Sequence, residues 1–199
     1  MRSRVVLLFA VLFLGTGAAV PLRETNHSRV QENFDFNQTL GQWFSIGSAG
    51  DSLWFETLMG TSRMIKFILS ATEETNKFKA ILVHEWNGTC INMTVYYEYL
   101  ESQQMFKYIP VPGYDAHIAI QVGLIQYQEF AFLIYDSQIQ GRKTKSVALY
   151  GRTRKLRTEI NEQFKEFVLR QGIPEEMIMF LPDKGSCSGN DDIWSTGRR

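Results

Sequence analysis

The chain has 199 residues, 44% of them hydrophobic, a length that suits one domain with a sizeable core. Lysine and arginine total 21, and so do aspartate and glutamate, which gives a formal net charge of zero. This balance excludes the overall positive field with which proteins bind nucleic acid or acidic membranes, so we expect no nucleic-acid partner.

The first predicted segment is a secretory signal peptide over residues 1–19. Arg2 and Arg4 precede an apolar run over residues 5–14, and small residues follow the run. The run is too short to span a bilayer as a helix, which needs ~20 apolar residues. No later stretch of the sequence is apolar enough to be a membrane anchor. We therefore expect a secreted, extracellular protein.

The mature chain is predicted to form one barrel domain, described below, over residues 20–187. Residues 188–199 are polar and are predicted to be a flexible tail. Removal of two arginines with the signal peptide leaves 21 − 2 = 19 basic against 21 acidic side chains, a charge of 19 − 21 = −2. The net charge of the mature chain therefore does not indicate any class of partner.

Cysteines and sequons agree with secretion. Cys90 and Cys187 are the two cysteines of the chain. In an oxidising compartment such an isolated pair is most simply read as one disulfide, which would attach the C-terminal segment to the middle of the chain. Four Asn-x-Ser/Thr sequons are candidate N-glycosylation sites: Asn26, Asn37, Asn87 and Asn92.

Eight short runs rich in Val, Ile, Phe and Tyr are predicted to be β-strands, because polar turn clusters separate them at the spacing of an all-β barrel or sandwich. They cover residues 41–49, 63–71, 77–86, 90–100, 104–110, 115–124, 128–137 and 145–152. In several runs apolar residues occupy both parities. Both faces of the sheet must therefore be covered by something apolar.

A helix predicted over residues 158–172 can supply part of that cover. Thr158 is its expected N-cap, and a single apolar stripe consists of Ile160, Phe164, Phe167 and Val168. Residues 175–181 are predicted to be a short final strand. The order favours an all-β fold: an eight-stranded antiparallel up-and-down barrel with one C-terminal α-helix packed outside and a short ninth strand.

The motifs of this chain resemble those of the lipocalin family. The family's first signature, a turn followed by Gly-x-Trp on the first strand, is matched by Asn33, Phe34, Gly41 and Trp43. An arginine that ends the last long strand is matched by Arg152, and the family's disulfide by the two cysteines. The resemblance implies that Gly41, Trp43 and Arg152 are structural residues of the barrel floor rather than ligand contacts.

Strand parity anchored on Arg152, together with the family alignment, predicts which side chains point into the barrel. The predicted ligand pocket consists of Ile65, Phe67, Leu82, His84, Val95, Tyr97, Phe106, Ile118, Ile120, Leu133, Tyr135, Ala148 and Tyr150. An alternative for His84 is a wet position near the barrel rim. An alternative for the whole set is that it fills a small, solid barrel.

Departures from the family bear on chemistry. Residues 50–52 lack the thiol that some members carry on the loop after the first strand, and Met64 aligns near the catalytic cysteine of an isomerase member. With both cysteines in a disulfide, thiol chemistry has no nucleophile. The histidines, His27, His84 and His117, share no metal-ligand spacing. We expect no enzyme activity, no metal and no cofactor.

The resemblance implies a monomeric carrier that binds a small hydrophobic ligand, such as a retinoid, fatty acid or steroid, in the barrel cavity. The alternative is an extracellular protein-interaction subunit that uses the barrel as a platform, with a cell-surface receptor or carrier protein as partner. Residues 142–157 include seven basic side chains and no acid, a patch that could meet heparin or an acidic receptor. More often such a run is a solvated turn and strand end.

Overall fold

The computed structural model describes residues 34–50, 63–86, 89–183 and 187. Its strands are β1 (Gly41–Gly50), β2 (Lys66–Ala71), β3 (Lys77–Trp86), β4 (Thr89–Leu100), β5 (Met105–Ile109), β6 (Ala116–Gln126), β7 (Phe130–Ile139), β8 (Arg142–Gly151) and β9 (Ile178–Phe180). The α-helix is α2 (Thr158–Arg170), and the 3₁₀ helices are η1 (Phe36–Thr39), η2 (Glu101–Gln103) and η3 (Glu175–Met177). The predicted signal peptide and tail lie outside the described residues, so the domain bounds stay predictions.

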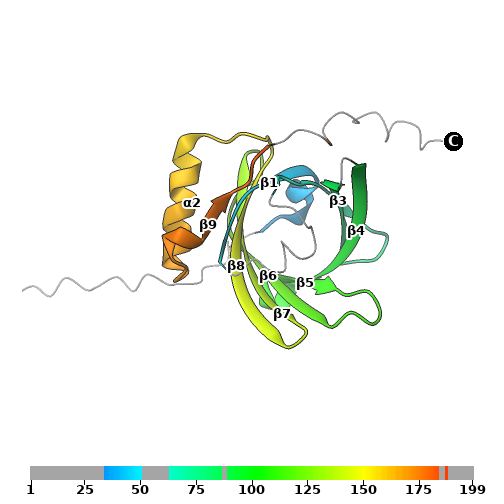
Figure 1. The fold of residues 1–199 in the computed structure, drawn as a ribbon. Helices are drawn as coiled ribbons and strands as arrows, with labels where there is room; N and C mark the ends of the chain where they lie inside the picture. Colours follow the sequence, from blue (N-terminus) through cyan, green and yellow to red (C-terminus); the bar gives the residue numbers. More distant parts are fainter. Residues whose placement is uncertain (1–33, 51–62, 87–88, 184–186, 188–199) are drawn as a thin grey trace, which may run out of the picture.

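Strands β1 to β8 close into an antiparallel barrel. From β2 to β8 each strand pairs with the next, and β1 completes the circle by pairing with both β8 and β2. Closure leaves these strands without an exposed edge. The short strand β9 pairs with β1 outside the circle, next to α2 (Figure 1). The predicted fold class is confirmed.

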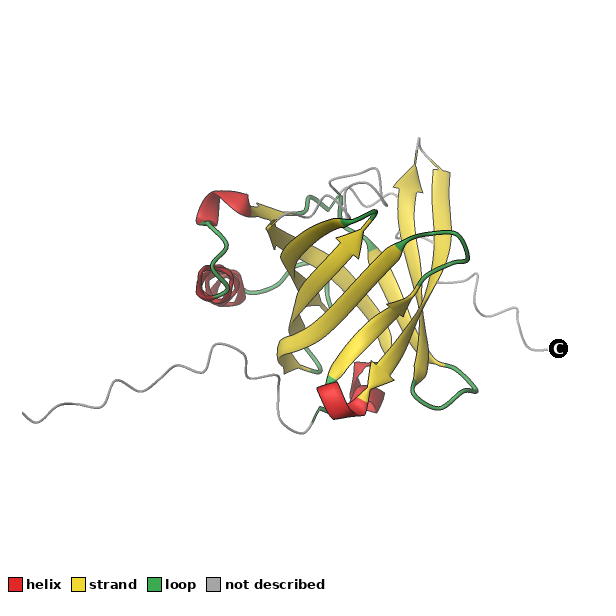
Figure 2. Ribbon diagram, turned by 90° about the horizontal axis from the view of Figure 1, so that it is seen from below, coloured by secondary structure: helices red, strands yellow, loops and turns green. Residues whose placement is uncertain are grey.

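Two apolar clusters cover the two faces of the sheet. One lies inside the barrel and contains side chains such as Trp43, Ile118 and Tyr150. The other lies between the outside of the barrel and α2, where Phe132 of β7 meets Phe164 with ring centroids 5.5 Å apart. Figure 2 shows α2 alongside the barrel wall. The second cluster explains why the strand sequences do not alternate cleanly between apolar and polar residues.

The helix α2 begins at Thr158, the residue that the sequence predicted to be its N-cap. Thr158 is its first helical residue, and Arg157 occupies the N-cap position without a side-chain capping bond. The prediction of Thr158 as N-cap was therefore wrong. Arg157 instead forms an ion pair with Glu129 of the β6–β7 turn, with Nε 2.7 Å from Oε1, which ties the helix start to the barrel. Among the described residues, no helix is long and apolar enough to cross a membrane.

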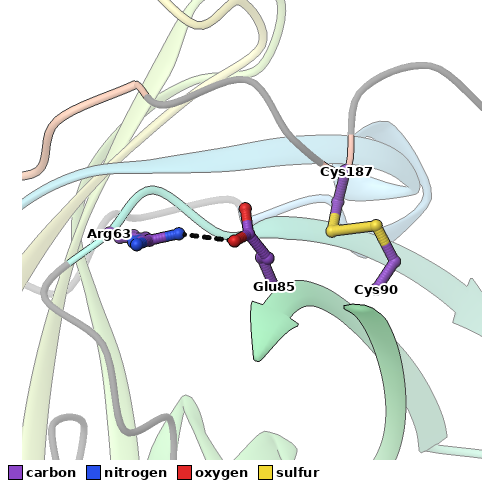
Figure 3. Close-up of a disulfide and its surroundings, with 4 residues drawn as sticks. All are labelled: Arg63, Glu85, Cys90 and Cys187. Carbon is purple, nitrogen blue, oxygen red and sulfur yellow. Dashed lines mark ion pairs between the residues drawn. A yellow bond between two sulfur atoms is a disulfide. The ribbon is translucent and has the colours of Figure 1, made fainter. Parts of the chain in front are cut away.

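The predicted disulfide is confirmed at the end of the barrel opposite Trp43. Cys90 of β4 is bonded to Cys187, and their Cα atoms are 5.6 Å apart. Beside this bond, Arg63 forms an ion pair with Glu85 of β3 at 3.0 Å (Figure 3). Because Glu85 is the register partner of Cys90, the ion pair and the disulfide tie neighbouring segments to the same strand pair. Both cysteines of the chain are thus consumed.

Candidate functional site

An apolar cavity lies in the half of the barrel nearest Trp43. Its volume is about 120 Å³. Its lining comes from η1 and from strands β1 to β8, since the inward residues of each strand point to the same space. The lining residues are Phe34, Thr39, Trp43, Phe67, Leu69, Phe78, Ala80, Tyr97, Phe106, Ile120, Val122, Ile125, Ala131, Leu133, Tyr135 and Tyr150.

The floor of this cavity is held by Trp43 and Arg152. The Trp43 indole donates a hydrogen bond from Nε1 to the Thr39 carbonyl at 2.7 Å, and the Arg152 guanidinium carbon lies 3.9 Å from the indole centroid. Gly41 has φ +94°, a backbone conformation that residues with a side chain rarely adopt, so this entry into β1 suits glycine. The guanidinium donates to the backbone carbonyls of Gln38, Leu40, Gln42 and Tyr127.

Three phenols supply most of the polarity of the lining. Tyr135 of β7 and Tyr150 of β8 share a hydrogen bond of 2.7 Å between their hydroxyl oxygens, and Tyr97 of β4 lines the same cavity. Burial raises the pKa of Tyr150 to about 12. Burial, and then the neighbouring phenols, hold the pKa of Tyr97 and of Tyr135 well above the usual value of a tyrosine. All three phenols therefore remain neutral at physiological pH.

The predicted pocket residues all lie on the interior side of the barrel, but they divide into two groups. The cavity is lined by Phe67, Tyr97, Phe106, Ile120, Leu133, Tyr135 and Tyr150. Farther from the floor along the same sheet, the interior is packed by Ile65, Leu82, His84, Val95, Ile118 and Ala148. Contact of either group with a ligand stays a prediction.

Several lining residues were not predicted. Leu69, Ala80 and Ala131 each lie two positions nearer the floor than a predicted residue of the same strand, so the same parity extended by one step would have found them. Ile125 follows a β-bulge between Val122 and Leu124, which changes the parity of the end of β6. Phe34 and Phe78 also line the cavity, and so does Trp43, which is a wall of the cavity as well as a structural residue.

His84 is buried, with 8% of its surface exposed, so the reading of a wet rim side chain was wrong. Its Nδ1 is buried without a hydrogen-bond partner among the described residues. Burial lowers the pKa of His84 below 6.5, which keeps the imidazole neutral at pH 7. Within the described ranges, no three His, Cys, Asp or Glu side chains are placed to hold a metal ion.

The basic run divides between the barrel end and the outer face. Arg154 pairs with Asp183 at 2.7 Å, and Arg157 with Glu129, so these cations are matched by acids. Lys143 and Lys145 of β8 are exposed. Of the sequons, Asn37 and Asn92 are exposed on η1 and β4, whereas those at residues 26 and 87 lie outside the described residues.

Comparison with known proteins identifies a family that this chain matches and several proteins to which it is similar. Residues 40–185 match the model of the lipocalin / cytosolic fatty-acid binding protein family. The chain is similar to Protein AMBP of Bos taurus, with 28% identity that covers 93% of this chain and 52% of the relative. It is also similar to Prostaglandin-H2 D-isomerase of Mus musculus, with 28% identity that covers 81% of this chain and 85% of the relative. The chain spans about half the length of the AMBP relatives it matches.

Similarity also extends to a protein named Lipocalin from Rhinella marina, with 25% identity that covers 79% of this chain and 85% of the relative. Among solved structures, the siderocalin Ex-FABP, described as functioning through dual ligand specificities, matches with a TM-score of 0.61. That match has 17% identity and covers 75% of this chain and 93% of that chain. At this identity the likeness shows the fold.

Proposed function

We propose that this chain, which belongs to the lipocalin / cytosolic fatty-acid binding protein family, is a secreted carrier that encloses a small hydrophobic ligand in its barrel. The observation that carries this proposal is the apolar cavity above Trp43, which side chains from η1 and from strands all around the barrel line together. Moving apolar ligand surface from water into such a lining contributes ~25 cal/mol per Å². The cavity thus offers a driving force and an apolar space for one small molecule.

The dimensions of the cavity bear on the ligand class. A volume of about 120 Å³ is below the ~300–1,000 Å³ of pockets that enclose drug-sized ligands. A slender aliphatic chain fits this space with less rearrangement than a steroid or a retinoid. Side chains farther from the floor, such as Leu82 and Ile118, would have to move for a longer or bulkier ligand.

Secretion and the absence of catalysis are parts of the same proposal. The signal-peptide pattern, the disulfide and the exposed Asn37 and Asn92 sequons support export through an oxidising compartment. Both cysteines are in the disulfide, so a thiol nucleophile like the one expected of an isomerase has no candidate in this chain. We therefore propose a carrier, not an enzyme, and a monomer.

Ligand titration tests the proposal. The secreted protein is titrated with palmitate, retinol and progesterone while tryptophan fluorescence is recorded. We compare it with Ala80→Phe, which places a ring in the cavity, and with Ala119→Phe, which places the same ring on the outer face between exposed Lys107 and Asp136. Binding should be saturable, weakened at least tenfold by Ala80→Phe, and unchanged by Ala119→Phe.

Two results would contradict the proposal. If no member of a broad lipid panel binds, the barrel is not a carrier of such ligands, and a stoichiometric protein recovered from native fluid without lipid would favour an interaction platform. If Ala80→Phe binds as well as the parent protein, the ligand lies outside the cavity. Far-UV circular dichroism of both variants checks that the barrel has folded.

A further inference from the structure

Few polar groups of the cavity lining are open to a ligand. The Trp43 Nε1–H is already donated to the Thr39 carbonyl. The Thr39 hydroxyl is donated in turn to the Phe36 carbonyl, 2.6 Å away. The remaining polar side chains of the lining are the phenols of Tyr97, Tyr135 and Tyr150. A polar group of a ligand in the cavity can therefore form hydrogen bonds only with these phenols among the side chains of the lining.

These phenols can satisfy a neutral polar group. A phenol hydroxyl both donates and accepts hydrogen bonds, so it can pair with an alcohol or a carbonyl. Tyr150 is bonded to Tyr135, and the Tyr97 hydroxyl receives no hydrogen bond from the described residues. Tyr97 lines the same cavity as Tyr150, and the nearby Tyr150 contributes to the raised pKa of Tyr97. A ligand oxygen placed beside Tyr97 can thus join a polar cluster that spans β4, β7 and β8.

Positive charge is missing from the same surface. None of the side chains that line the cavity is Lys, Arg or His, among the residues that the structure describes. Arg152 lies against the Trp43 ring and is not part of the lining, and its guanidinium donates to four backbone carbonyls. His84 is inside the barrel, but its burial favours the neutral ring.

An anion is therefore costly in this cavity. A carboxylate that leaves water needs a cation or several donors to compensate for its lost hydration, whereas a neutral hydroxyl needs one or two hydrogen bonds. The phenols report the same environment, because burial holds the pKa of Tyr97 and of Tyr135 high and disfavours their anions. The cavity thus accommodates a neutral oxygen and disfavours a charged one.

We propose that the cavity selects slender neutral amphiphiles, such as long-chain alcohols and ketones, over carboxylates with the same carbon chain, with the polar end of the ligand directed inward to Tyr97 and Tyr150. This inference rests on the proposed carrier function and narrows its ligand class. The inference distinguishes two binding modes. In the proposed mode the polar end of the ligand points inward, whereas a fatty acid bound tail first could keep its carboxylate at the mouth of the barrel.

Matched ligands and a matched pair of variants test the inference. Decanol, a decanone and decanoate are titrated into the folded full chain at pH 7.4 by calorimetry. The parent protein should bind the alcohol and the ketone about 100-fold more tightly than the carboxylate. Tyr97→Phe should weaken decanol about tenfold, the equivalent of one hydrogen bond, and leave decanoate unchanged. Tyr99→Phe, two residues along β4 and outside the lining, should change neither.

The outcomes distinguish this inference from the function on which it rests. Decanoate binding within threefold of decanol overturns the selectivity while the carrier function stands. Selectivity that survives Tyr97→Phe without loss of decanol affinity overturns the inward orientation. If none of the three ligands binds, the carrier function fails with them. The comparison of ligands on the parent protein needs no variant, so a folding defect in Tyr97→Phe leaves the selectivity testable.

Discussion

Replacing Arg152 should lower the free energy of unfolding more than the loss of any single surface contact would. Its guanidinium donates at 2.7 to 3.0 Å to four carbonyls and stacks 3.9 Å from the Trp43 centroid. At roughly 0.5–1 kcal/mol for each of these partly exposed bonds, and ~0.5–2 kcal/mol for the stacking, Arg152→Ala should cost about 4 kcal/mol. Arg152→Lys keeps the charge but loses the planar fork, and should cost about half as much.

Urea unfolding followed by far-UV circular dichroism measures these differences without relying on the fluorescence of Trp43. A double-mutant cycle with Trp43→Phe should give a coupling of ~1 kcal/mol between the two side chains. A loss below 1 kcal/mol for Arg152→Ala would refute the reasoning, because water would then replace the guanidinium at all four carbonyls. Equal stability of Arg152→Lys and the parent protein would refute the role of the fork.

Three further changes probe the packing, the buried histidine and the disulfide. Gly123→Ala would place a Cβ 2.3 Å from Phe167 Cζ, so it should lower the free energy of unfolding by ~1–3 kcal/mol, as measured by thermal unfolding. An unchanged melting temperature would contradict this prediction and would indicate that α2 shifts to accept the methyl group. The folded-state pKa of His84 is lowered, so the unfolded chain takes up the proton first as the pH falls through ~6.5. Stability should therefore fall below that pH by up to ~1.4 kcal/mol per unit, and His84→Leu should flatten this dependence in urea titrations at pH 7.5 and 5.5. Cys90→Ser with Cys187→Ser opens a loop with a sequence separation of 97 and should cost ~4–5 kcal/mol on the chain-entropy model, whereas an unchanged urea midpoint would contradict it.

The fold was predictable because its signals are local. Gly41 and Trp43 mark the entry into the first strand, and the apolar runs with their turn clusters mark the rest of the sheet. The stripe through Phe164 and Phe167 identified the helix that covers the outer face. The family resemblance read from these motifs is confirmed by the match over residues 40–185. The N-cap of the helix was assigned wrongly because threonine is a favoured capping residue. In the structure Arg157 occupies the N-cap position, and its side chain pairs with Glu129 instead of capping the helix.

The amino-acid sequence by itself determined the strands of the barrel and the disulfide, since strand period, turn chemistry and paired cysteines depend on neighbouring residues or on residue type. The floor of the barrel followed from the resemblance of its motifs to those of the family. Only the tertiary structure decided where the interior is empty. Inward side chains such as Leu82 and Ile118 pack against one another, whereas small Ala80 and Ala131 leave space above Trp43. That difference depends on side-chain volumes summed around a ring of strands. It also depends on the bulge that β6 forms where it pairs with β7, which turns Ile125 inward.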